Sequence, residues 1–296
     1  MRVMVTGGSG FIGRHVVARL GEVHDVLAPT HGELELTDAE AVRSWLSTHA
    51  PDAVVHAAVK PGHRNAPDPT GLAYDNLRQF FALLRCRGAF GRLVVVGSGA
   101  AYGVQRPLCE VREEDLGEAV PADEHGFSKY VEALELARDA DAVELRPFGV
   151  FGAGEDYAIR FVSNACCKAL LGLPLTLRQD RRFSYVSVED LARVVELALH
   201  GPAGGGLAPG AYNVTPHPPV SLLDLAGEVL RVSGAGAGVV VGEPGVGREY
   251  SGDGTRLRAA APGFTPEPLA AGVARLYAWY EERRGTLDRA LLLTDR

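Results

Sequence analysis

Short apolar runs alternate with longer amphipathic stretches along the first half of the chain. The apolar runs predict strands at 3–5, 26–27, 52–58, 92–97 and 142–146. The amphipathic stretches predict helices at about 11–20, 38–49, 72–87 and 126–140. Strands that alternate with helices of about 10–15 residues predict a parallel sheet covered by helices on both faces. Continuously apolar strands agree with this, because such a sheet is buried on both sides.

The second half has a different pattern. Helices are expected at 189–200, 222–232 and 269–284, and the stretch from about 201 to 247 is rich in Gly and Pro. Its first part, 201–210, is expected to be a surface loop. A length of 296 residues suits two domains of roughly 150 residues each.

Composition excludes several classes of protein. Hydrophobic residues make up 46% and charged residues 23%, as in a water-soluble globular protein. A net charge of −7 argues against binding to nucleic acid, and no apolar run approaches the roughly 20 residues that span a membrane. The first residues lack the features of a signal peptide, so a cytoplasmic location is expected. The four cysteines have no CxxC spacing, which predicts neither a metal site nor disulfides.

The glycines Gly7, Gly10 and Gly13 stand between the first predicted strand and the first predicted helix. In that context the first lets the chain turn, the second lets a pyrophosphate approach the backbone, and the third lets the helix pack on the strand. The phosphates would lie at the positive end of the helix. The motif therefore predicts a dinucleotide cofactor.

The choice between NAD and NADP depends on the end of the second strand. An acidic residue there would bind the ribose hydroxyls of NAD, but the first carboxylate after Leu27 is that of Glu33. A 2′-phosphate would not be repelled, and Arg14 or His31 could contact it. NADP is therefore expected in preference to NAD.

Several motifs together resemble one family. They include the glycine motif, the run His56-Ala57-Ala58, Ser98 four residues before a Tyr-Gly pair, and the segment 145–152. By these the chain resembles the extended short-chain dehydrogenase/reductases that act as nucleotide-sugar epimerases, dehydratases and reductases. The segments 33–38 and 57–60 look most like 4-keto-sugar reductases of the GDP-fucose synthase kind.

The resemblance implies a fold and a set of cofactor contacts. The fold would be α/β, with a Rossmann-type doubly wound parallel sheet and a smaller C-terminal α/β substrate-binding domain. The dinucleotide-binding domain would comprise 1–151 and about 182–215, and the second domain about 152–181 and 216–296. The implied cofactor contacts, besides the three glycines, are Phe11, Ile12, Arg14, Thr30, His31, Asp38, Ala57, Ala58, Val59, Lys129 and Pro147.

The reaction centre of the family combines Ser or Thr with Tyr-x-x-x-Lys. The resemblance assigns Ser98 and Lys129 to it, but the Tyr position holds His125. Tyr130 follows the lysine and points elsewhere on the helix. In the family the lysine holds the nicotinamide ribose, and the serine hydrogen-bonds to the reacting oxygen. His125 is therefore the expected proton-transfer group.

The charge of His125 follows from its neighbours. Lys129 lies one turn away and an oxidised nicotinamide is also positive, so both should hold the His125 pKa below its usual value of about 6.5. A neutral imidazole favours alcohol oxidation, or ketone reduction at lower pH.

Other functions are compatible with the same residues. One is an epimerase or dehydratase that recycles NAD, and another is a catalytically impaired cofactor-binding protein with a sensing or partner role. A third uses a different acid or base, such as Cys109, Glu113, Glu114 or Asp123.

The substrate would be a small nucleotide-linked sugar, whose diphosphate suits the paired donors of arginine. The arginines that could contact it are Arg160, Arg178, Arg181, Arg182, Arg248 and Arg256. Lys60, Arg182 and Arg256 are the predicted substrate contacts. Arg182 is one position away from the arginine usual in the family, where Phe183 stands. The family also implies a homodimer, formed by the helix at 72–87 and the helix that follows His125.

Overall fold

The computed structural model describes residues 1–60 and 71–294. A six-stranded sheet forms its centre, and every pairing in it is parallel. Its strands in spatial order are β11 (Gly210–Val214), β6 (Ala142–Pro147), β4 (Arg92–Val96), β3 (Ala53–His56), β1 (Arg2–Thr6) and β2 (Asp25–Leu27). The order reverses at β1, where a doubly wound sheet binds its ligand beyond the carboxyl ends of the strands. The predicted Rossmann-type fold is thus confirmed.

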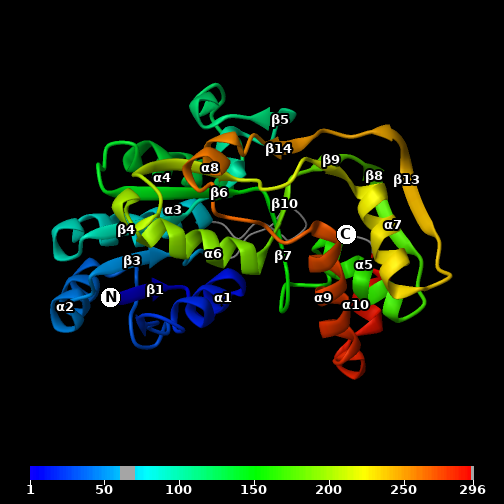
Figure 1. Cartoon of the computed structure of the whole chain (residues 1–296), viewed down its shortest axis with the longest axis horizontal. Helices are drawn as coiled ribbons and strands as arrows, with labels where there is room; N and C mark the ends of the chain where they lie inside the picture. Colours follow the sequence, from blue (N-terminus) through cyan, green and yellow to red (C-terminus); the bar gives the residue numbers. More distant parts are fainter. Residues whose placement is uncertain (61–70, 295–296) are drawn as a thin grey trace.

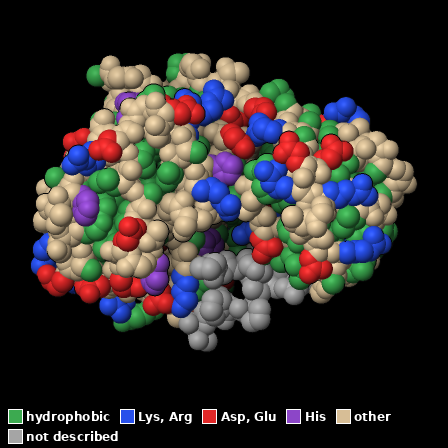
Figure 2. Space-filling view, turned by 90° about the horizontal axis from the view of Figure 1, so that it is seen from below, with side chains coloured by type: hydrophobic (Ala, Val, Ile, Leu, Met, Phe, Trp, Pro, Cys, Tyr) green, Lys and Arg blue, Asp and Glu red, His purple; other side chains and the backbone are tan. Residues whose placement is uncertain are grey.

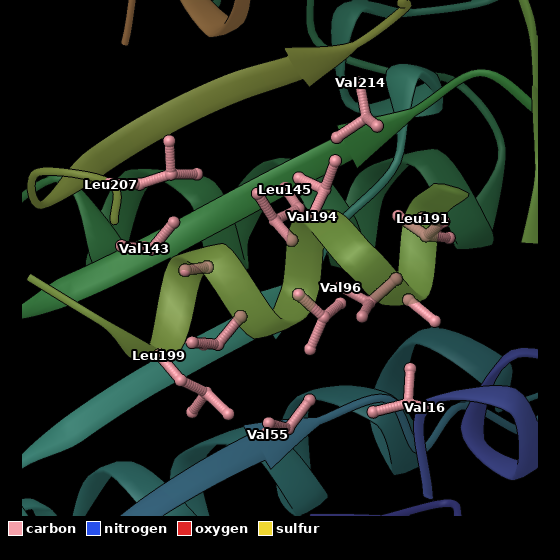
Figure 3. Close-up of a cluster of buried hydrophobic side chains, with 14 of the residues drawn as sticks. Val16, Val55, Val96, Val143, Leu145, Leu191, Val194, Leu199, Leu207 and Val214 are labelled. Carbon is pink, nitrogen blue, oxygen red and sulfur yellow. The ribbon is translucent and has the colours of Figure 1, made fainter. Parts of the chain in front are cut away.

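Successive residues of these strands point to opposite faces. Val3 and Val5 join a core with α1 (Phe11–Leu20) and α6 (Val188–Leu199), whereas Met4 joins a second core on the opposite face. The helices of this second face are α2 (Ala39–His49), α3 (Leu72–Leu84) and α4 (Glu124–Leu136). Figure 3 shows α6 lying across the sheet, with its apolar side chains over those of β4 and β6.

The rest of the chain builds a separate core beside this sheet, to the right in Figure 1. Its helices are α5 (Phe161–Leu170), α7 (Leu222–Ser233), α9 (Leu269–Glu281) and α10 (Arg289–Leu293). Beside them β8 (Leu175–Asp180) pairs with β13 (Val239–Val246). We propose that the two cores are two domains, as the resemblance implies. However, α8 (Thr255–Ala260) lies with the first domain, because Leu257 packs in the sheet core.

Two further small sheets contain the remaining strands of the described residues. One pairs β7 (Gly149–Phe151) with β10 (Tyr185–Ser187). The other has the order β12 (Val220–Ser221), β9 (Arg182–Phe183), β14 (Tyr250–Gly252) and β5 (Leu108–Val111). Figure 2 shows acidic and basic side chains interspersed over the face seen from below.

Some helix boundaries differ from those expected. The helix expected at 126–140 begins at Glu124, because the Asp123 carboxylate accepts a hydrogen bond from the Gly126 backbone N–H at 2.8 Å and caps it. The helices expected to end at residues 87 and 284 end at Leu84 and Glu281. No helix in the described part of the chain is long and apolar enough to cross a membrane.

Candidate active site

The glycine loop joins β1 to α1 and is tightly packed. Gly7 has φ +70°, and a Cβ atom there would lie 2.7 Å from Ala58 Cα. A Cβ on Gly13 would lie 2.0 Å from the Gly7 carbonyl oxygen. Neither position admits a side chain. Gly10, by contrast, is open except towards the Gly7 carbonyl oxygen, which would lie 3.2 Å from a Cβ atom added there. A diphosphate can therefore approach the loop at Gly10, where Phe11 and Ile12 begin α1.

The ends of β1 and β3 are held together by a buried histidine. The Thr6 hydroxyl lies 2.8 Å from His56 Nδ1 and also accepts a hydrogen bond from the Ala58 backbone N–H at 3.3 Å. Burial, reinforced by the Lys129 charge, lowers the pKa of His56 to about 3, so its ring is neutral. This contact fixes Ala57 and Ala58 beside the glycine loop, and the exposed Val59 follows them.

The predicted contacts to the adenosine end have partners within the chain. Asp38 caps α2 by accepting hydrogen bonds from the backbone N–H groups of Glu40 and Ala41. Arg14 donates to the carbonyl oxygens of Gly10 and Gly154, so it joins the glycine loop to the loop after β7. Beyond β2, Thr30 donates through its backbone N–H and its hydroxyl to the Glu33 carboxylate, both at 2.8 Å. The exposed His31 pairs with Glu35 at 3.4 Å.

Ser98 follows β4 by two residues. Its side-chain oxygen accepts a hydrogen bond from the Ala100 backbone N–H at 3.1 Å and caps a short 3-10 helix, Gly99–Tyr102. Because the oxygen is the acceptor in this contact, the hydroxyl hydrogen can be donated to a ligand.

The first turns of α4 carry the other two predicted catalytic residues. His125 and Lys129 are four residues apart and therefore share a face of the helix. α4 packs against the 3-10 helix that Ser98 caps, which brings the three residues to one region. Lys129 is only 4% exposed. Its Nζ donates to Glu132 Oε2 at 2.8 Å and to the Val96 carbonyl oxygen at 3.3 Å.

Glu132 is the residue that sequence reasoning missed. An acid three residues after a lysine on a helix is within reach of an ion pair, and that spacing was the available signal. The effect expected of Lys129 on His125 took no account of this partner.

A buried polar network lies on β6 below this region. Arg146 donates to Glu144 Oε2 at 2.6 Å and to the Tyr102 hydroxyl at 2.8 Å. Tyr102 in turn donates to Asn213 on β11. The strand ends at Pro147, which is buried. The network fixes the end of β6 that the resemblance places under the nicotinamide.

Lys60 lies at the end of the β3 segment. Its backbone N–H donates to Asn76 Oδ1 at 2.7 Å, and its Nζ donates to Asp75 Oδ2 at 2.5 Å. The Asn76 Nδ2 atom is buried without a hydrogen-bond partner in the described residues. Such an orphaned donor, together with the open face of Gly10, fits a bound dinucleotide.

The two predicted substrate arginines are not brought together. Arg182, on β9, is exposed and donates to the Pro219 carbonyl oxygen at 3.1 Å. Arg256, on α8, lies over the Tyr212 ring and against Gly210, the first residue of β11. Gly210 is at the amino end of β11, whereas the cofactor would bind beyond the carboxyl ends of the strands. Arg256 therefore has no role beside the glycine loop.

The alternative acids and bases are placed less well for chemistry. Cys109 is exposed on β5. Glu113 accepts a hydrogen bond from the Asn213 backbone N–H at 2.7 Å, and Asp123 caps α4. Glu114 lies beside Glu113 in a short 3-10 helix. No group of His, Cys, Asp and Glu in the described residues could hold a metal ion, and the four cysteines are free.

Comparisons with known proteins agree with this geometry. Residues 3–215 match the NAD dependent epimerase/dehydratase family. The chain is 26% identical to a GDP-L-fucose synthase of Azorhizobium caulinodans, over 94% of the chain and 96% of the relative. It is 28% identical to a dTDP-4-dehydro-6-deoxy-D-allose reductase of Streptomyces, over 94% and 95%. A solved GDP-mannoheptose C4 reductase from Campylobacter jejuni with NADP bound shares the fold, with 18% identity and a TM-score of 0.78 over 95% of this chain and 98% of that one.

Proposed function

The chain belongs to the NAD dependent epimerase/dehydratase family, and from that membership we propose that it is an NADP-linked reductase of a nucleotide-linked 4-keto sugar. The observation that supports this proposal most is that Ser98 caps the 3-10 helix after β4, while His125 and Lys129 lie on α4, which packs against that helix. The relatives named above support the substrate class, because one is a synthase of a GDP-sugar and another reduces a dTDP-4-keto sugar.

The residues fit a bound NAD(P), which would supply the hydride to the ketone carbon. The glycine loop and the start of α1 would hold its diphosphate. Lys129 has three N–H donors, of which Glu132 and Val96 take two, so one remains for the nicotinamide ribose.

The protein's own groups would act on the ketone oxygen. Ser98 would donate a hydrogen bond to it, and the protonated His125 ring would transfer a proton to it as the hydride arrives at carbon. The product is the corresponding secondary alcohol. Because imidazole is shorter than phenol, His125 is expected to reach the oxygen through one water molecule.

Absorbance at 340 nm tests this function directly. Purified protein is mixed with NADPH or NADH and a panel of nucleotide-linked 4-keto-6-deoxy sugars. We expect consumption of reduced cofactor with a member of the panel, and none when the sugar is omitted. If absorbance at 340 nm stays constant with every sugar of the panel and mass spectrometry detects no altered sugar, the proposal is overturned. An altered sugar without net loss of cofactor would instead identify a redox-neutral epimerase or dehydratase.

The cofactor preference is a separate prediction. The Glu33 carboxylate is turned back onto Thr30, and His31 is exposed at the end of β2 where a 2′-phosphate would lie. We therefore expect NADPH to bind about tenfold more tightly than NADH, the strength of one charge-assisted contact. His31→Ala should weaken NADPH binding and leave NADH binding unchanged, as measured by fluorescence titration. A tenfold preference for NADH in the unaltered protein would contradict the assignment.

A further inference from the structure

The buried ion pair on α4 has a consequence for the neighbouring histidine. Lys129 and Glu132 are 4% and 2% exposed in their side chains, with 2.8 Å between Nζ and Oε2. Opposite charges so close offset each other in part for groups farther away, although the Lys129 charge still helps to lower the pKa of His56. Burial raises the pKa of Glu132 and the Lys129 ammonium opposes that rise. With one shared proton on either Lys129 Nζ or Glu132 Oε2, the pair as a whole is neutral.

Without Glu132, the positive charge of Lys129 would act on His125. Residues four apart on a helix have Cβ atoms about 5–6 Å apart. At that separation an ammonium without a counter-charge strongly disfavours the charged imidazolium. The presence of Glu132 decides whether His125 experiences a positive neighbour or a neutral pair.

Other charged and titratable groups surround this part of α4. On α4 and its cap they are Asp123, Glu124, Tyr130 and Glu135, and on the elements packed against it they are Tyr74, Asp75, Arg78, Tyr102, Glu144 and Arg146. On β3, His56 is neutral. Among the buried groups, Glu144 forms an ion pair with Arg146. None of these residues is substituted in Glu132→Gln.

We propose that Glu132 is a positioning residue of the reaction centre, whose carboxylate holds the Lys129 ammonium and offsets its charge at His125. The imidazole can then carry a proton near neutral pH. This rests on the proposed function in one respect, because reduction of a ketone needs a protonated group at His125. It also revises the expectation of a neutral His125, which considered the Lys129 charge without Glu132.

Histidine titration by NMR tests the proposal without substrate. The full-length protein is labelled with 15N-histidine, and the His125 signal is assigned by its absence in His125→Gln. We expect Glu132→Gln to lower the His125 pKa by about one unit, the effect of one uncompensated charge at this separation. Glu135→Gln is the matched control, since Glu135 lies on the same helix and pairs with Arg138, just beyond the end of the helix, in a more exposed place. It should leave the His125 pKa unchanged. An unchanged pKa in Glu132→Gln would overturn the proposal.

Glu132→Gln leaves a buried ammonium without its counter-charge, which destabilises the folded protein. A second variant tests the proposal if Glu132→Gln does not fold. The double variant Lys129→Met with Glu132→Gln replaces a neutral pair by two neutral side chains. We expect its His125 pKa to stay within about 0.3 units of the unaltered protein. A rise of about one unit would refute the proposal, since it would mean that the lysine charge acts on His125 despite Glu132.

The titration and the reductase assay can fail independently. The proposal about Glu132 depends on the pKa of His125, whereas the proposed function depends on turnover. In an active enzyme, turnover in the direction of reduction should fall as pH rises through the His125 pKa. Glu132→Gln should move that fall to lower pH by the same amount as the NMR shift, and a profile that does not move with the NMR pKa would contradict the assignment of His125 as the acid.

Discussion

Replacing His125 by alanine should lower kcat/KM for ketone reduction by about 10³-fold, within the range that a positioned general acid contributes. The affinity for NADPH should survive, because the glycine loop and the segment after β3 do not depend on His125. Steady-state rates at 340 nm give the first quantity, and a fluorescence titration of NADPH gives the second.

The matched control for this prediction is His49→Ala. His49 lies at the end of α2, where its ring contacts the Trp45 carbonyl oxygen, and it takes no part in the candidate site. Its turnover should equal that of the unaltered protein. If His125→Ala also keeps full turnover, then the proton comes from elsewhere and the proposed reaction centre is wrong. If both turnover and NADPH binding are lost, then His125 supports the fold of the site.

The parts of the site that could be predicted are those set by local sequence. The glycine loop is an example, because the close approaches at Gly7 and Gly13 are made within one strand, turn and helix or to the next strand. The start of α2 is another, since Asp38 is both a good N-cap residue and the first residue of the predicted helix. Apolar runs also located five of the six strands of the central sheet, because most side chains of a strand that is buried on both faces are apolar. The sixth strand, β11, was not predicted.

The parts that could not be predicted depend on side chains meeting across the fold. Arg14 suits a phosphate in the sequence, but in the structure it reaches the Gly154 carbonyl oxygen, 140 residues away. Arg256 suits a diphosphate, but it lies over the Tyr212 ring. Long flexible side chains of this kind can choose among several partners, and the choice is made by tertiary packing.

The paired strands β8 and β13 were missed for a related reason. β8 and β13 pair although about 60 residues separate them, and β13 is exposed along most of its length. An exposed strand rich in Val, Gly and Pro has no alternation of buried and exposed positions. Its pairing partner fixes it as a strand, and that partner is not local.

The stability of the protein should fall as pH rises from about 5 to 8, because of one buried acid. Glu155 is 8% exposed and accepts a hydrogen bond from the Ser163 hydroxyl at 2.7 Å. Burial raises its pKa to about 8, so the folded protein holds a proton there that the unfolded chain has lost above about pH 4.5. The folded state therefore loses stability as pH rises through this window, by at most ~4 kcal/mol over three pH units.

Glu155→Gln removes the titration and keeps the hydrogen bond from Ser163. The free energy of unfolding in urea is measured for both proteins at each pH. The value for the variant minus that for the unaltered protein should increase steadily from pH 5 to pH 8. Glu33→Gln is the control, because Glu33 accepts the Thr30 hydroxyl in a similar way but is exposed, and hydrogen bonds from Thr30 lower its pKa. The stability that Glu33 contributes is lost only as pH falls below its usual range, so its difference should be flat from pH 5 to 8. A flat difference for Glu155→Gln as well would mean that Glu155 is ionised in the folded protein, and that water or a charged partner reaches it in its buried position.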